Sequence, residues 1–476
     1  MLTVRSSSWV SLAALLVGCT SADVSDRAPA GEDPLEAPAT KPASGGDTAP
    51  SSGAADEGPK GPLRVAVVEG ARDGIPVLFH DAEGVVIGQT KTDAEGIAIA
   101  PDELAPAQVS ALLGDGEHHL TVSWVGVARG DVLRVKNLAR PTSGEGSFQL
   151  TPPGDVPGAE YYAAADGRCF GGPPLYSSNG TAPLSYYSCW SDKNAAIVRA
   201  ANTNDGVVAF SFVKGLPSPT THGVPVKLET WVTPAKLVLD TVSVPDGMNA
   251  FTTMRQDIDG VLHPTDGQSV RNADGTYGTM REFLVPPGLA ERYVGRSDAS
   301  RQDPDGGHRN VLSIERALVD ASSGSTIDFA RALPEITSVT SNGEDPKRPA
   351  LSWASVAPIA DADGGVISFG WGTSSFSVGG PMGYSPDSGA WRVYVPPGSA
   401  SVKLPILPAE YAAWLPLEGT MRGSVRFDAI DDFDGYAAYR QAIGGESSWI
   451  GDQNWLVSPG TITPKQGDVR SSSRTF

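Results

Sequence analysis

Asp-Gly dipeptides recur throughout the chain after residue 62, and they constrain its fold more than any other feature. Both residues tolerate positive φ, so the dipeptide favours tight hairpin turns. Helical periodicity is limited to residues 408–415, with 308–323 ambiguous. The pattern predicts an all-β fold of tandem Ig-like β-sandwiches. The eleven dipeptides begin at Asp73, Asp115, Asp166, Asp205, Asp246, Asp259, Asp266, Asp274, Asp305, Asp363 and Asp434. The β-rich runs between them include 120–127, 197–203, 207–213, 226–232 and 424–430.

One tetrapeptide, Asp-Ala-Glu-Gly, occurs twice, at residues 81–84 and 93–96. We expect both copies to be turns of a three-stranded meander, with strands at 77–80, 85–91 and 97–100. Successive turns of a meander lie at opposite ends of a sheet, so the two carboxylate pairs would be roughly 25 Å apart. A shared metal ion needs its ligands within a few ångström, so the repeat predicts two turns and no metal site.

The first 18 residues have the features of a signal peptide: a positive Arg5, then a short apolar core. This core is too short to span a membrane, which takes roughly 20 apolar residues. Leu16-Val17-Gly18-Cys19 resembles the lipobox of bacterial lipoproteins. The resemblance implies that Cys19 carries a lipid, and that Thr20 directs the protein to the outer membrane, on its periplasmic or its surface face.

Residues 19–62 are rich in Ala, Pro, Gly, Ser and acid, and they hold few large apolar side chains. Such a composition predicts a disordered tether with a mean reach on the order of 35 Å. The formal net charge of −19 argues against nucleic acid and against an electrostatic membrane contact, because both require basic surfaces.

The segment 63–137 resembles the carboxypeptidase regulatory-like, transthyretin-like or Ig-like sandwich domains of bacterial surface proteins. Gly74-Ile75-Pro76-Val77, Thr92-Asp93-Ala94-Glu95-Gly96 and the later run 124–131 carry the resemblance. It implies an interaction module with no catalytic residues. His80-x-x-Glu83 matches a zinc-peptidase spacing, but it straddles a predicted turn, and the third ligand would have to be His118 or His119.

The remainder divides into two predicted β-sandwich regions, 138–330 and 331–476, which belong to no family that the sequence suggests. A Pro-Pro-Gly segment follows an apolar run at 152–154, 286–288 and 396–398, and we expect each to end a strand. The spacings of 134 and 110 residues are unequal and give only weak support for repeated sandwiches. They are too long for a solenoid or a propeller, whose units are about 20 to 50 residues long.

Cys169 and Cys189 are the two cysteines besides Cys19, and in an exported protein they predict one disulfide. Two buried free thiols are the alternative. The loop between them holds Tyr176, Tyr186 and Tyr187. Such a loop presents rings to a sugar or to a partner protein, or covers the end of a sandwich.

Trp449 and Trp455 lie in a Gly/Ser-rich segment and are candidate exposed rings for carbohydrate binding. No Gly-x-Ser-x-Gly or His-Glu-x-x-His motif is present, and the six histidines lack metal-ligand spacing. Acidic clusters at 257–260, 303–306, 361–364 and 431–435 depart from the calcium-loop pattern and are predicted to be solvated turn acids, with weak calcium binding between adjacent loops as the alternative.

These observations predict a lipid-anchored envelope protein with a structural or protein-binding role, with no catalysis, metal or cofactor. The alternative is a surface protein that binds or degrades carbohydrate. Its partners would be the membrane, through the lipid, and an envelope protein or a glycan.

Overall fold

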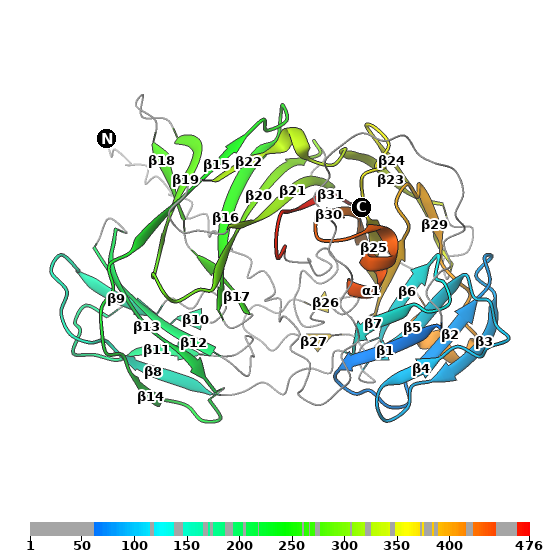
Figure 1. Ribbon diagram of the computed structural model, residues 1–476, viewed down its shortest axis with the longest axis horizontal. Helices are drawn as coiled ribbons and strands as arrows, with labels where there is room; N and C mark the ends of the chain where they lie inside the picture. Colours follow the sequence, from blue (N-terminus) through cyan, green and yellow to red (C-terminus); the bar gives the residue numbers. More distant parts are fainter. Residues whose placement is uncertain are drawn as a thin grey trace, which may run out of the picture.

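The computed structural model describes residues 61–114, 119–137, 146–164, 170–171, 175–185, 194–202, 206–217, 219–258, 261–265, 267–271, 277–304, 307–318, 325–342, 348–371, 374–375, 383–384, 389–415, 422–443 and 464–476. Strands dominate these ranges, and the all-β prediction is confirmed (Figure 1). In the described part of the chain, no helix has the length and apolar character needed to cross a bilayer.

The first strands form a two-layer sandwich. They are β1 (Arg64–Glu69), β2 (Pro76–His80), β3 (Val86–Lys91), β4 (Ile97–Ile99), β5 (Gln108–Gly114), β6 (His119–Val125) and β7 (Val132–Lys136). One layer has the order β4-β1-β7, and the other has β6-β5-β2-β3. Val65, Phe79 and Trp124 are buried between the two layers.

A second group of strands packs around its own core, which includes Leu150, Leu184 and Val198. The strands are β8 (Ser147–Thr151), β9 (Tyr161–Ala164), β10 (Phe170–Gly171), β11 (Ala182–Ser185), β12 (Asn194–Ala201), β13 (Val207–Leu216) and β14 (Val224–Lys227). They form two sheets, β10-β11-β8-β14 and β13-β12-β9.

The third group comprises β15 (Ala235–Val242), β16 (Asn249–Ile258), β17 (Val261–Thr265), β18 (Gly267–Arg271), β19 (Tyr277–Val285), β20 (Arg292–Gln302), β21 (Arg309–Leu318), β22 (Ser325–Asp328) and the 3-10 helix η1 (Phe329–Arg331). The sheet β18-β19-β15-β22 packs on β16, β20 and β21, and Leu239, Met254 and Phe283 lie in the core between them.

The last group comprises β23 (Ile336–Asn342), β24 (Ala350–Ser355), β25 (Gly364–Trp371), β26 (Ser374–Ser375), β27 (Gly383–Tyr384), β28 (Gly389–Val395), β29 (Ser401–Lys403), the 3-10 helix η2 (Ala409–Trp414), β30 (Arg422–Ile430), α1 (Gly435–Ala442) and β31 (Asp468–Thr475). The sheet β23-β24-β29 covers Phe369, Trp391 and Phe427 of the larger sheet beneath it.

One twelve-stranded sheet connects these groups, in the order β17-β16-β20-β21-β31-β30-β25-β28-β6-β5-β2-β3. It runs from β16 and β17 to β3 at the right edge of the view, and the strands β8 to β14 at the left lie outside it (Figure 1). β6 pairs with β28 in parallel, with Leu120 opposite Ala390 and Trp124 opposite Tyr394. The domain boundaries expected at residues 137 and 330 stay predictions, but hydrogen-bonded strand pairing crosses both of them.

Both Asp-Ala-Glu-Gly segments are turns, and their first aspartate explains why. The Asp81 carboxylate accepts hydrogen bonds from the amides of Glu83 and Val85, and the Asp93 carboxylate accepts one from Ile97. The glycine of each copy has positive φ, at 79° and 86°. The predicted meander is wrong, however, because β3 pairs with β2 whereas β4 pairs with β1 in the opposite layer. The chain turns between layers after β3, which lets both sheets cover one core.

The Pro-Pro-Gly segments end strands as expected, since β8, β19 and β28 each stop directly before one of them. Of the two helical candidates, residues 409–414 form η2, while 309–318 form β21. The sequence prediction did not include α1, which follows Asp434.

Candidate functional site

The predicted binding residues divide between described and undescribed parts of the chain. Tyr176 is 81% exposed, more than any other large apolar residue that is described. It follows Leu175, whose backbone forms a two-bond bridge with Tyr162 at 2.7 Å in each direction. The Gly180 amide donates to the Ser177 carbonyl just beyond it. The loop therefore holds the Tyr176 ring out in solvent.

The other predicted site residues lie outside the described residues. They are Cys19, Cys169, Cys189, Tyr186, Tyr187, Trp449 and Trp455. The same holds for the signal peptide and for residues 19–60 of the predicted tether. The lipid attachment, the disulfide and the tryptophan pair therefore stay predictions.

A second exposed surface lies at the start of β3, the last strand of the twelve-stranded sheet. Val85, Ile87 and Ile406 are 46%, 38% and 41% exposed, and we call these three residues the β3 patch. The Ile406 amide donates to the Gly84 carbonyl at 2.8 Å, which places Ile406 beside the start of the strand. β3 and β11, the strand that follows Tyr176, lie in opposite halves of the molecule (Figure 1).

Packing beneath the β3 patch explains its position. The Arg348 side chain donates to the carbonyls of Glu83 and Leu404, so it connects the turn before β3 to the segment after β29. Gly84 has φ of 79°, and a Cβ there would lie 2.9 Å from the Cα of Pro405. The glycine thus permits both the turn and the close approach of the second segment.

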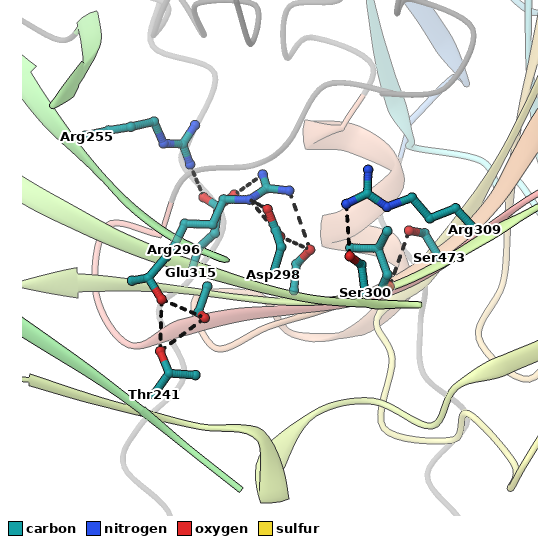
Figure 2. A network of polar contacts seen from close by, with 12 residues as sticks. Thr241, Arg255, Arg296, Asp298, Ser300, Arg309, Glu315 and Ser473 are labelled. Carbon is teal, nitrogen blue, oxygen red and sulfur yellow. Dashed lines mark hydrogen bonds and ion pairs between the residues drawn. The ribbon is translucent and has the colours of Figure 1, made fainter. Parts of the chain in front are cut away.

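Buried ions lie on the middle strands of the large sheet, and sequence reasoning did not find them. Glu315 of β21 is 2% exposed and accepts hydrogen bonds from Arg255 of β16 and Arg296 of β20. Arg296 also holds Asp298, with 2.9 Å between the guanidinium Nε and the carboxylate. Figure 2 shows these four side chains gathered on one face of the strands, with Thr241 on the other. We call the four residues the ion cluster.

Charges balance within the ion cluster, which has two guanidinium groups and two carboxylates. The two carboxylates raise the pKa of Arg296 above its ordinary value, more than offsetting the lowering by burial. Such a balanced arrangement cross-links β16, β20 and β21 rather than supplying an acid–base pair. Arg296-x-Asp298 in β20 and Arg426-x-Asp428 in β30 share one spacing. Because strand residues two apart share a face, this repeat is the sequence signal that would have predicted the ion pairs.

The zinc spacing at His80 does not form a site. His80 is fully buried, and its Nε2 lies 3.0 Å from the Ser110 hydroxyl, whereas Glu83 lies in the exposed turn. Burial lowers the pKa of His80 to about 4. No group of three or more potential metal ligands occurs within the ranges that the structure describes.

Several aspartates of the acidic clusters accept hydrogen bonds from amides or arginines, whereas Asp361 and Asp434 are exposed as expected of turn acids. The Asp432 carboxylate accepts hydrogen bonds from the backbone amides of Lys465 and Gln466, and the Asp431 carboxylate accepts one from the backbone amide of Asp468. Other members of these clusters have similar partners. Asp257 forms an ion pair with Arg292, and Asp303 forms one with Arg474. The Asp363 carboxylate accepts hydrogen bonds from the amides of Ile430 and Gly435.

No family model matches the chain, and no curated protein matches it. Among solved structures it is similar to the Bacillus anthracis TIE protein, with 13% identity, a TM-score of 0.13, and 56% of this chain and 50% of that chain covered. This chain therefore matches half the length of that protein.

Two further solved structures are similar to the chain. A calcium-stabilised adhesin with which an Antarctic bacterium binds ice has 12% identity and a TM-score of 0.12, and 78% of this chain and 95% of that chain are covered. A Bacteroides ovatus protein, SGBP-B of a mixed-linkage glucan utilization locus, was solved with a heptasaccharide; it has 8% identity and a TM-score of 0.12, and the coverage is 90% and 98%. Likenesses this weak carry no argument about function.

Proposed function

We propose that the protein is a lipid-anchored component of the cell envelope that binds another envelope protein and has no catalytic role. The β3 patch is the observation that carries this proposal, because three exposed apolar side chains lie beside a strand whose outer edge has no partner strand among the described residues. An unpaired edge adds an extended peptide through main-chain hydrogen bonds, and neighbouring apolar residues select its side chains. The partner is therefore an extended segment with apolar residues at alternate positions.

The membrane part of the proposal rests on the sequence. We infer that Cys19 carries a lipid and that residues 19–62 form the tether that separates the folded region from the outer membrane. The carboxypeptidase regulatory-like resemblance of residues 63–137 supports an interaction role, since β3 belongs to that segment. The Cys169–Cys189 disulfide stays part of the proposal.

A pull-down from outer-membrane extract, run beside a glycan array, tests the protein-binding role. The full chain should capture one protein, and Ile87→Lys should abolish capture while the melting temperature stays within about 2 °C of wild type, because an exposed substitution costs little stability. Val356 is an apolar residue that is 65% exposed and directly follows the last residue of β24. The segment with Ile406 pairs with the chain just before the first residue of β24, so Val356→Lys is the matched control that should retain capture. Equal capture by wild type and Ile87→Lys would contradict the proposal.

Carbohydrate binding is the second candidate, and the exposure of Tyr176 favours it. An exposed aromatic ring on a held loop packs against the apolar face of a sugar. Array signals lost in Tyr176→Ala, Trp449→Ala or Trp455→Ala, but kept in Ile87→Lys, would replace the first proposal with this one.

A further inference from the structure

Arg392 of β28 is a buried cation that the ion cluster does not neutralise. It is 4% exposed, and the strand register places it opposite Ser368 of β25 and Val122 of β6. The Tyr394 hydroxyl lies near enough to favour the charged guanidinium, and no carboxylate of the described residues contacts it. Burial lowers the pKa of Arg392, and the nearby positive Arg426 lowers it further. A buried guanidinium without a counter-charge is strongly unfavourable.

The neighbouring charges on this face are already paired. Asp428 accepts hydrogen bonds from Arg426, Ser471 and Tyr439, at 2.6 to 3.0 Å. Glu315 and Asp298 balance the two arginines of the ion cluster. Among the buried ions that the structure describes on this face, Arg392 is therefore the one without a carboxylate partner, and a single negative charge would balance it.

Residues with hydroxyl groups are neighbours of Arg392 in the sheet. The buried Ser368 Oγ has no hydrogen-bond partner in the part of the chain that the structure describes. Ser368 is paired in register with Arg392 on one side and with Ser424 on the other. Tyr394, two residues along the same strand, supplies a third hydroxyl on this face. An unsatisfied buried hydroxyl beside a guanidinium without a carboxylate partner is the donor set that an oxyanion requires.

We propose that Arg392, Ser368 and Tyr394 form a binding site for one monovalent carboxylate group, from a small organic acid or an acidic sugar. A planar guanidinium matches the two oxygens of a carboxylate, and the Ser368 hydroxyl donates a further hydrogen bond to it. A single guanidinium without a carboxylate partner selects a monoanion over a dianion. This inference does not depend on the protein-binding role, because the β3 patch and Arg392 lie on different strands.

Thermal unfolding of the full chain in sodium formate, with ionic strength held constant by sodium chloride, tests the site. The melting temperature should rise saturably by about 3 °C or more, since a ligand that binds only the folded state stabilises it. Arg392→Met should remove this dependence on formate. Arg309 is an exposed arginine on the same face that donates to the Ser300 hydroxyl, so Arg309→Met should keep the dependence (Figure 2).

Isothermal titration of formate into Ser368→Ala provides a second, milder test. Ser368→Ala keeps the guanidinium groups of Arg392 and Arg426. Loss of the one hydrogen bond from the Ser368 hydroxyl should raise the Kd for formate about fivefold. A wild-type melting temperature insensitive to formate would overturn the proposal, as would an equal response in Arg392→Met. If Arg392→Met does not fold, an unchanged Kd in Ser368→Ala overturns the proposal.

Discussion

At the scale of single residues, buried polar side chains join neighbouring strands of the large sheet. His80 hydrogen-bonds Ser110, Ser110 hydrogen-bonds Ser123, and the Trp391 indole donates to Ser123 at 2.8 Å. These four residues lie on β2, β5, β6 and β28, which are adjacent in the sheet. Because satisfied buried polar groups fix one arrangement of a core, this chain of hydrogen bonds specifies how β6 meets β28.

The buried His80 should make stability depend on pH. Its pKa is about 4 in the folded protein and 6.5 when unperturbed, so the unfolded chain binds a proton first as the pH falls. The free energy of unfolding should therefore fall between pH 6.5 and pH 4, by up to about 3 kcal/mol from this residue. Urea unfolding of wild type and His80→Gln at pH 7.0, 5.5 and 4.5 measures the difference.

His80→Gln should lose less stability than wild type over this range, because it removes the titrating group. His222 is exposed, and His222→Gln serves as the control that should keep the wild-type pH dependence. A His80→Gln variant with the pH dependence of wild type would contradict the assignment to His80.

Glu315 should be the most sensitive member of the ion cluster. Glu315→Gln removes the buried carboxylate that both Arg255 and Arg296 contact, which should cost about 3 to 5 kcal/mol. Chemical denaturation checks this value. Asp102 forms an ion pair with Arg129 but is 87% exposed, so Asp102→Asn should have no measurable effect. Similar stability of the two variants would show that the ion cluster is not structural.

At the scale of elements, side chains of α1 connect the N-terminal sandwich to the C-terminal strands. Arg440 of α1 donates two hydrogen bonds, of 2.8 and 2.7 Å, to the carboxylate of Asp131, which is fully buried just before β7. Tyr436 of α1 donates to the carbonyls of Val125 and Tyr394, at the ends of β6 and β28. The helix thus covers the joint between the two parts of the sheet.

Removing only the arginine of the Arg440–Asp131 ion pair should lower the free energy of unfolding substantially. Arg440→Met leaves the Asp131 carboxylate buried without its cation, and we expect a loss of about 3 to 5 kcal/mol. Adding Asp131→Asn should recover part of the loss, because the amide oxygen still accepts the Ala128 amide and carries no charge. Denaturation of both single variants and the double variant gives the coupling; additive losses would contradict it.

Much of this local structure was predictable, and the exceptions have physical causes. The turns at Asp73-Gly74 and Asp246-Gly247, the Pro-Pro-Gly strand ends and the exposure of Tyr176 follow from local chemistry that the sequence displays. Asp363-Gly364 and Asp434-Gly435 instead lead into β25 and α1. α1 was missed because its eight residues are too short for a clear helical period. The pairing of β4 with β1 and of β6 with β28 depends on strands far apart in the chain, which local patterns do not encode.

At the scale of the whole molecule, the large sheet makes separate sandwiches depend on one another. The core of the first sandwich includes Val366, Tyr394, Ile430 and Val469 from the C-terminal part of the chain. On the opposite face, Leu78 and Leu112 pack with Trp391 and Phe427. Strands β2 and β5 are therefore buried on both faces. On each face, some of the side chains that bury them come from the C-terminal part of the chain.

The fragment 61–137 should for this reason be far less stable alone than in the full chain. It would expose the outer face of β2 and β5, including Leu78 and Leu112, at about 25 cal/mol for each Å² of apolar surface. It would also lose the Tyr394 ring that packs against Trp124 inside the sandwich. Circular dichroism and denaturation of the fragment measure this. A fragment that unfolds cooperatively with the stability of the full chain would show that residues 63–137 form an independent domain.

The proposed protein-binding role is tested most directly by site-specific photo-crosslinking in intact cells. A photoreactive amino acid at position 87, in the β3 patch, should form an adduct with one envelope protein, and the same amino acid at position 356 should form none. No adduct at position 87, or the same adducts at both positions, would contradict the account.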